Sequence, residues 1–153
     1  MMATSNAPDA DTKDVRIERV FWSDHEADLA AVRRAVFIEE QGVPEDLEWD
    51  GEDAESIHFL ARSGDGTPIG CIRLLPSGQI SRLSVIEAWR HQGIGQALLD
   101  AVEDEARRRS MPEIYLHAQT QATHFYEAAG FSVSGGIFIE ADIPHRQMFK
   151  DLR

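Results

Sequence analysis

The segment Arg90-His91-Gln92-Gly93-Ile94-Gly95 decides the fold, because it places two glycines one residue apart at the start of a helical pattern. The stretch before it, "SGQISRLSV" (77–85), is typical of a strand. After it, apolar residues recur at helical spacing: Ile94, Ala97, Leu98, Ala101, Val102 and Ala106. The first N–H groups of a helix have no intrahelical partner and lie at the positive end of the helix dipole. A strand, a tight turn and such a helix therefore predict an anion site.

We expect the main-chain amides of the first helical turn, which Gly93 and Gly95 leave open to a close ligand, to bind a phosphate, with Arg90 adding a cation at the rim. A tight turn that needs a positive φ at one glycine is the alternative interpretation. A Walker loop is excluded because the sequence lacks its Gly-Lys-Ser/Thr. A dinucleotide fingerprint is excluded because its third glycine would fall at Leu98.

Length and composition predict one ordinary globular domain. The chain has 153 residues and a net charge of −12, which argues against nucleic acid as a partner. No apolar run is long enough to span a membrane, and the first residues lack a secretory pattern, so we expect a cytoplasmic protein. Residues 1–14 are polar and predict a disordered lead-in to a domain over 15–153. The single cysteine, Cys71, is expected to be a core residue.

Acidic residues are concentrated between positions 35 and 61, where no Lys or Arg occurs. This pattern is typical of a solvated acidic face. The alternative is a region that attracts or holds a cation.

The periodicity predicts a mixed α/β sheet with helices packed on it. Strands are expected at 15–22, 56–62, 68–76, 77–85, 113–118, 131–136 and 142–152. Helices are expected after Ser23, which forms a capping-box pattern with Glu26, then from Ile94, and over 119–130.

Two motifs carry a resemblance to a known family. Arg/Gln-x-x-Gly-x-Gly/Ala after a strand ending "RLSV", and later "QATHFYEAAGF" (121–131), resemble the GNAT superfamily of acyl-CoA-dependent N-acyltransferases. The stretches "RRAVFIEEQGV" (33–43) and "EADIPHRQM" (140–148) resemble its ElaA-like branch. The resemblance runs from about Val15 to the C-terminus. It implies a single-domain fold with about seven strands and about four helices, whose fourth and fifth strands splay apart.

The resemblance also implies acetyl-CoA as the co-substrate and assigns residues to it. The main-chain amides from Gln92 to Gln96 would bind its pyrophosphate. Backbone groups of the fourth strand would pair with the pantetheine arm as an extra strand would. The amide near Val85 could stabilise the oxyanion, and Tyr126 matches the family's general acid. The full set expected to bind the coenzyme is Leu83, Ser84, Val85, Arg90, His91, Gln92, Gly93, Ile94, Gly95, Gln96 and Gln119. For the base or proton relay, His117, His145 and Glu40 remain open alternatives.

Acyl-homoserine-lactone synthases share this fold, and their pattern of arginines and aspartates is similar to Arg33, Phe37, Asp50, Asp53 and Arg73. Those charged residues could form a network that fixes a loop over the acceptor pocket. We assign them, with His145, to substrate binding. Separate surface charges are the alternative. These synthases also carry a Glu three residues before an Arg on the fourth strand, where this chain has Gln79 and Arg82. The missing carboxylate counts against lactone synthesis.

The sequence thus predicts an acetyl-CoA-dependent N-acetyltransferase that works by direct transfer in a ternary complex. The acceptor is expected to be a small-molecule or peptide amine, with no metal, nucleic acid or membrane involved, and the protein a monomer or homodimer. Two other hypotheses remain: an acyl-homoserine-lactone-synthase-like acyltransferase, and a non-catalytic acetyl-CoA-binding sensor.

Overall fold

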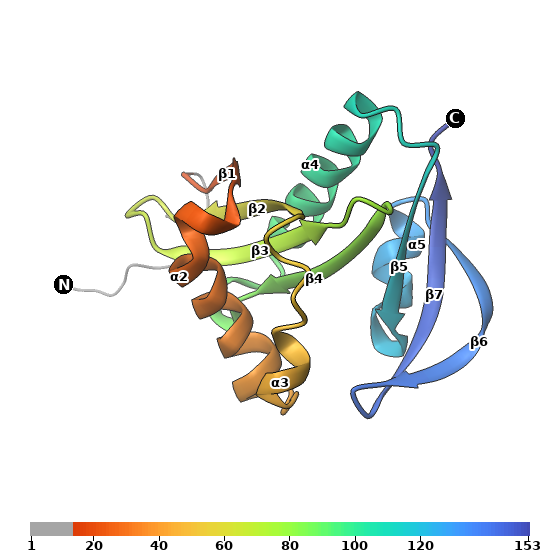
Figure 1. The fold of residues 1–153 in the computed structure, drawn as a ribbon, viewed down its shortest axis with the longest axis horizontal. Coiled ribbons are helices and arrows are strands. Elements are labelled where there is room, and N and C mark those ends of the chain that lie inside the picture. Colours follow the sequence, from red (N-terminus) through yellow and green to blue (C-terminus); the bar gives the residue numbers. More distant parts are fainter. Residues whose placement is uncertain (1–13) are drawn as a thin grey trace.

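The computed structural model describes residues 14–153, so the predicted N-terminal lead-in lies outside the described residues except for Asp14. Seven strands form one sheet in the order β1-β2-β3-β4-β5-β7-β6 (Figure 1). The strands are β1 (Arg16–Val20), β2 (Ile57–Arg62), β3 (Pro68–Leu74), β4 (Gln79–Val85), β5 (Glu113–Gln119), β6 (Ser132–Glu140) and β7 (Ile143–Asp151). The α-helices are α2 (Trp22–Arg33), α3 (Glu45–Glu48), α4 (Ile94–Arg108) and α5 (Thr123–Ala128), and a π-helical segment, Arg34–Glu40, follows α2.

The sheet forks between β4 and β5. All neighbouring strands are antiparallel except this parallel pair, which is matched only at Gln79↔Tyr115 and Ile80↔Leu116. Beyond these positions the two strands diverge, and Figure 1 shows β1–β4 on the left and β5, β7 and β6 on the right. A register shift against β3 and a left-handed φ of 58° at Arg82 mark a bulge in β4 at this level. The predicted mixed fold with a splay between the fourth and fifth strands is confirmed.

The two faces of the sheet carry separate cores. The apolar stripe of α4, including Leu98 and Val102, packs with β2–β5 and β7 in the larger core. Leu29 and Val32 of α2 pack on Leu60 and Cys71 in the smaller core on the other face. On β5, Ile114, Leu116 and Ala118 enter the α4 core. Since side chains alternate along a strand, the residues between them, including His117, point to the face that carries α2.

Two details of the sequence prediction are wrong. The capping box is not formed: α2 begins two residues earlier than predicted, its N-cap is Phe21 instead of Ser23, and no side chain caps it. The strand predicted to end at Gly136 continues to Glu140. Gly135, with φ 79°, sits at a register shift between β6 and β7, so the glycines make a bulge instead of ending the strand.

Candidate active site

A cavity of about 1050 Å³ lies in the fork of the sheet. Its walls come from β4, the turn before α4, β5, α5, the α2–α3 region and the β6–β7 hairpin. Among the predicted site residues, those that line it are Asp50, Arg73, Leu83, Ser84, Val85, Arg90, His91, Gly93, Ile94, Gly95, Gln96, His117, Gln119, Tyr126 and His145. Gln92, Arg33 and Asp53 are not among its lining residues. The volume is at the upper end of the range typical of small-molecule sites.

The predicted pantetheine-binding strand has one free edge. Ser84 and Val85 pair with Cys71 and Gly70 of β3, but no described strand pairs with them on the side of the fork. Main-chain groups on that edge can therefore pair with an extended ligand.

The turn before α4 has the geometry of an anion site. Gly93 is the N-cap residue and has φ 85°. The first backbone hydrogen bond of α4 is donated by the Ala97 amide to Gly93 O, at 3.0 Å. Within residues 14–153, the amides from Gln92 to Gln96 have no main-chain acceptor. These N–H groups are free to bind an anion at the positive end of α4.

The two glycines differ in what they require. The backbone at Gly93 is left-handed, which glycine adopts freely. A Cβ at Gly95 would lie 3.6 Å from Cζ of Phe125 on α5, which is an ordinary van der Waals contact, so the protein itself leaves room for a methyl group there. The positive φ accounts for the glycine at position 93. At position 95 no protein contact requires a glycine, so only a ligand close to the backbone would account for it.

Arg90 is not a free cation at the rim. Its two terminal nitrogens bind the Glu40 carboxylate at 2.7 and 2.6 Å, and its Nε donates to Val85 O at 2.8 Å. The hydrogen bonds from Arg90 hold the pKa of Glu40 below its ordinary value. A carboxylate bound in this way is a poor proton acceptor, so the structure disfavours Glu40 as the base.

Tyr126 lies at the cavity wall on α5. Its ring makes edge-on contacts with Phe125 and Phe131, with centroid distances of 5.0 and 6.0 Å. Its hydroxyl makes no hydrogen bond with any residue in the described part of the chain. Burial raises the pKa of the phenol to about 12, because the phenolate would lose its hydration. The group is therefore protonated at neutral pH and able to donate.

The two candidate histidines also line the cavity. His117 is on β5, and its Nδ1 lies 3.0 Å from Glu140 Oε1. His145 is on β7, and its Nδ1 lies 2.7 Å from Ile143 O. Gln119, which was expected to bind the coenzyme, donates to Gln41 Oε1 at 3.0 Å and so links β5 to the end of the π-helical segment.

The predicted network of arginines and aspartates is assembled behind the cavity wall. Arg33 binds Asp53 at 2.7 Å, and Arg73 binds Asp53 at 3.0 Å and Asp50 at 2.9 Å. Arg33 and Asp53 are buried and do not line the cavity themselves, but they bind Arg73 and Glu48, which do. Together these contacts hold the loop after α3 against β3.

Two further residues of the network, Glu48 and Arg82, were not assigned to it from the sequence. Glu48 accepts from Arg33 Nε at 2.8 Å, and Arg82 Nε lies 2.9 Å from the same carboxylate. Burial acts to raise the pKa of Asp50, but hydrogen bonds from Arg73 and Glu52 N–H and the charge of Arg82 hold the pKa at about 2. All three carboxylates of this network are turned inward onto arginines.

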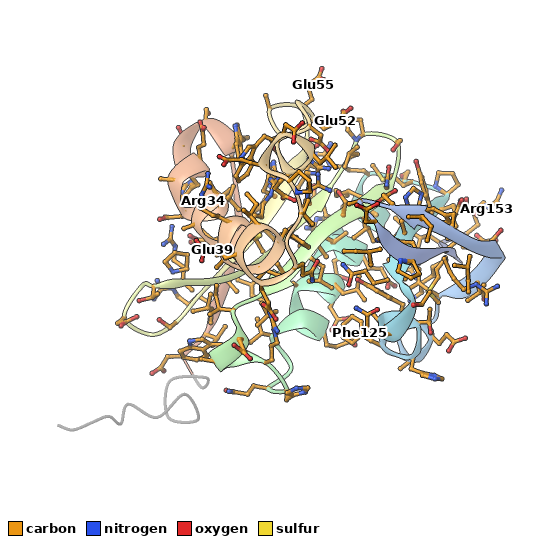
Figure 2. All side chains as sticks on the ribbon, turned by 90° about the horizontal axis from the view of Figure 1, so that it is seen from below. Arg34, Glu39, Glu52, Glu55, Phe125 and Arg153 are labelled. Carbon is orange, nitrogen blue, oxygen red and sulfur yellow. The ribbon has the colours of Figure 1, made fainter. Side chains whose placement is uncertain are left out.

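The carboxylates of the acidic segment, residues 35–61, therefore fall into two groups. Its inward carboxylates hold the protein's own guanidinium groups, whereas Glu39, Glu52 and Glu55 are exposed (Figure 2). Within residues 14–153, no three His, Cys, Asp or Glu side chains are grouped so that they could hold a metal ion. None of the described helices is both long and apolar enough for a membrane span.

Comparison with known proteins agrees with this architecture. The model of the acetyltransferase (GNAT) domain matches residues 12–152. The uncharacterised N-acetyltransferase YjcF of Bacillus subtilis is 37% identical over 128 residues, which cover 81% of this chain and 91% of YjcF. The ElaA protein of Escherichia coli is 30% identical over 81% of this chain and 86% of ElaA.

Solved structures give the same result. The crystal structure of Escherichia coli ElaA matches with a TM-score of 0.80 and 28% identity, covering 89% of this chain and 99% of that one. An acyl-CoA N-acyltransferase from Pseudomonas aeruginosa matches with a TM-score of 0.78 and 28% identity, covering 89% and 99%. The forked sheet, the amide-lined turn and these relatives together establish that the chain belongs to the GNAT family of acetyltransferases, in its ElaA-like branch.

Proposed function

We propose that this protein transfers an acetyl group from acetyl-CoA to a primary amine, directly and within a ternary complex. The observation that carries the proposal is the fork between β4 and β5, which leaves one edge of Ser84 and Val85 without a described partner strand, beside the free amides before α4. The arm of the coenzyme would pair with that edge, and the amides from Gln92 to Gln96 would bind its pyrophosphate. We also propose that the reaction takes place in the cytoplasm.

In this reaction, different residues of the cavity would supply the proton and stabilise the oxyanion. The coenzyme supplies the acyl group as a thioester. The Tyr126 hydroxyl, which has no other hydrogen-bond partner in the described chain, would donate a proton to the departing sulfur. The Val85 amide would stabilise the oxyanion that forms on the thioester carbonyl. Because both reactants lie in one cavity, no covalent intermediate on the protein is required.

The function is tested by a thiol-release screen. Acetyl-CoA is offered with a panel of amines: a polyamine, an amino sugar, free amino acids and a lysine-containing peptide. Release of coenzyme A with one class of amine supports the proposal. Tight binding of acetyl-CoA without release for any amine would instead identify a sensor.

Cys71 should not disturb this assay. It is 1% exposed, and burial raises the pKa of its thiol to about 11. At pH 8 only about a thousandth of such a group is thiolate, which is the form that reacts. We expect the native protein to show no reaction with a thiol reagent, and the urea-unfolded chain to show one thiol. Rapid labelling of the folded protein would contradict this.

The glycine turn provides a test of coenzyme binding. Gly93→Ala places a side chain on a left-handed backbone, which costs about 1–2 kcal/mol. The turn is expected to relieve this strain by shifting its backbone, which moves the amides out of position. We expect the Kd for coenzyme A to rise about tenfold by calorimetry. Gly66→Ala is the matched control, since its backbone is also left-handed, with φ 89°, but it does not line the cavity, so the Kd should change little. Equal affinity of the two variants would refute the role assigned to the turn.

A further inference from the structure

We propose that Glu140 positions His117 as the general base that removes the proton of the acceptor amine. The inference rests on the proposed function and adds to it a residue on β6, within the part of the strand that the sequence did not predict. His117 would be the catalytic residue and Glu140 the positioning residue.

His117 occupies the place in β5 where a base is needed. The last β5 residue paired with β4 is Leu116, so His117 is the first residue beyond the point where the fork opens. The amides before α4 lie at the other end of β4, next to Val85. A thioester whose phosphates are bound there extends toward the closed end of the fork, where His117 lines the cavity.

Within residues 14–153, the contacts of the imidazole leave one nitrogen free. Nδ1 lies 3.0 Å from Glu140 Oε1, so a neutral ring that donates to this carboxylate carries its proton on Nδ1. Nε2 is then the basic nitrogen. Phe138 meets the ring edge-on, with a centroid distance of 5.1 Å and an interplanar angle of 82°, and so limits its rotation. The same arrangement of carboxylate and imidazole orients the base in hydrolytic triads.

The acid and the base approach from opposite faces of the sheet. Tyr126 belongs to α5 and packs with the core on the α4 face, whereas His117 points to the face that carries α2. The amine can therefore attack from one side while the thiolate leaves on the other.

The protons balance as follows. Nε2 of His117 takes a proton from the acceptor ammonium, and the neutral amine attacks the thioester carbonyl. A bond from nitrogen to carbon forms, and the carbon–sulfur bond breaks. The sulfur takes a proton from Tyr126, and the second proton of the amine re-protonates the phenolate through solvent. His117 releases its proton to water, so one proton leaves for each ammonium acetylated.

The other titratable groups of the cavity are less suited. Asp50 and Glu48 are bound to arginines, and Glu40, which Arg90 binds, does not line the cavity. Glu52 lies on an exposed loop after α3, and His91 lies in the turn before α4, at the phosphate end of the cavity. His145 lies one strand farther from β4, at a position paired with Gln119, and its Nδ1 contacts a main-chain carbonyl instead of a carboxylate. Among the described residues that line the cavity, only His117 combines a place at the fork with a charged partner.

The test compares variants of this pair in the thiol-release assay, with acetyl-CoA and the panel amine that gives the highest rate. His117→Ala should lower kcat about a hundredfold, and Glu140→Gln about tenfold, with the KM for acetyl-CoA unchanged. Glu140→Asp should recover part of the rate. Free imidazole should restore turnover in His117→Ala. No such rescue is expected if His117 has only a structural role.

The chain offers a matched control. His124 and Glu127 on α5 form a similar pair at 3.3 Å, but His124 is 97% exposed and does not line the cavity. His124→Ala and Glu127→Gln should leave kcat unchanged. A His117→Ala variant that keeps full activity, or loses it without rescue by imidazole, would overturn the assignment.

A second measurement separates this inference from the proposed function. Nitrogen-15 NMR of the free protein should show the Nδ1–H tautomer at His117, and Glu140→Gln should redistribute it. If this tautomer is absent, the pairing is wrong even when the enzyme is active. If no amine releases thiol, the base role fails together with the proposed function, whatever the tautomer.

Discussion

Replacing Arg33 with methionine is expected to lower the free energy of unfolding by about 3–5 kcal/mol. The guanidinium is 1% exposed and binds Asp53 and Glu48, which would be left as buried carboxylates with fewer partners. Its charge also lies over the rings of Trp22 and Trp49, at 5.5 and 5.1 Å. Methionine keeps much of the volume but none of these interactions.

The neighbouring residue is the matched control. Arg34 pairs with Glu45, and both side chains are largely exposed, at 42% and 57%. Solvent screens such a pair, so Arg34→Met should leave the urea midpoint almost unchanged. Arg33→Met should lower it clearly, with a fall in Tm of roughly 10 °C. If both variants unfold at the same urea concentration, the network does not stabilise the fold as argued.

Replacing Tyr126 with phenylalanine is expected to reduce kcat by about a hundredfold or more while the Kd for coenzyme A stays the same. The change removes one hydroxyl and keeps the ring contacts with Phe125 and Phe131. Because burial raises the pKa of this phenol to about 12, the acid stays protonated across the neutral range. Tyr126 should therefore cause no loss of rate until the pH approaches 12.

Tyr115 serves as the control for this variant. Its hydroxyl lies 3.3 Å from Ser77 Oγ, and it does not line the cavity. Tyr115→Phe should retain the rate of the unaltered enzyme in the same assay. An active Tyr126→Phe enzyme would mean that another group, or water, protonates the sulfur.

The sequence was most informative where local chemistry determines structure. The turn before α4 follows from two glycines and a helical stripe, and Gly93 has the positive φ that such a turn demands. The network around Arg33 and Asp53 was suggested by the resemblance to acyl-homoserine-lactone synthases, whose pattern of arginines and aspartates this sequence shares, and the structure brings the two side chains together.

The sequence could not reveal contacts that depend on long-range register. Glycines at 135 and 136 suggest the end of a strand, yet β6 continues beyond them and brings Glu140 to His117. Arg90 was expected to face a phosphate, but Glu40, fifty positions away in the chain, already binds it. Such pairings depend on how distant segments pack, and no local pattern encodes them.

The free edge of β4 has a consequence for how the family can diversify. A ligand held through peptide groups places few demands on the identities of residues 83–85, because every amino acid except proline offers the same donor and acceptor there. Leu83 and Val85 also line the cavity, so substitutions there that keep their packing on the α4 core can reshape it for a different amine. Donor recognition and acceptor choice can change independently, so a new specificity can arise without loss of the old chemistry.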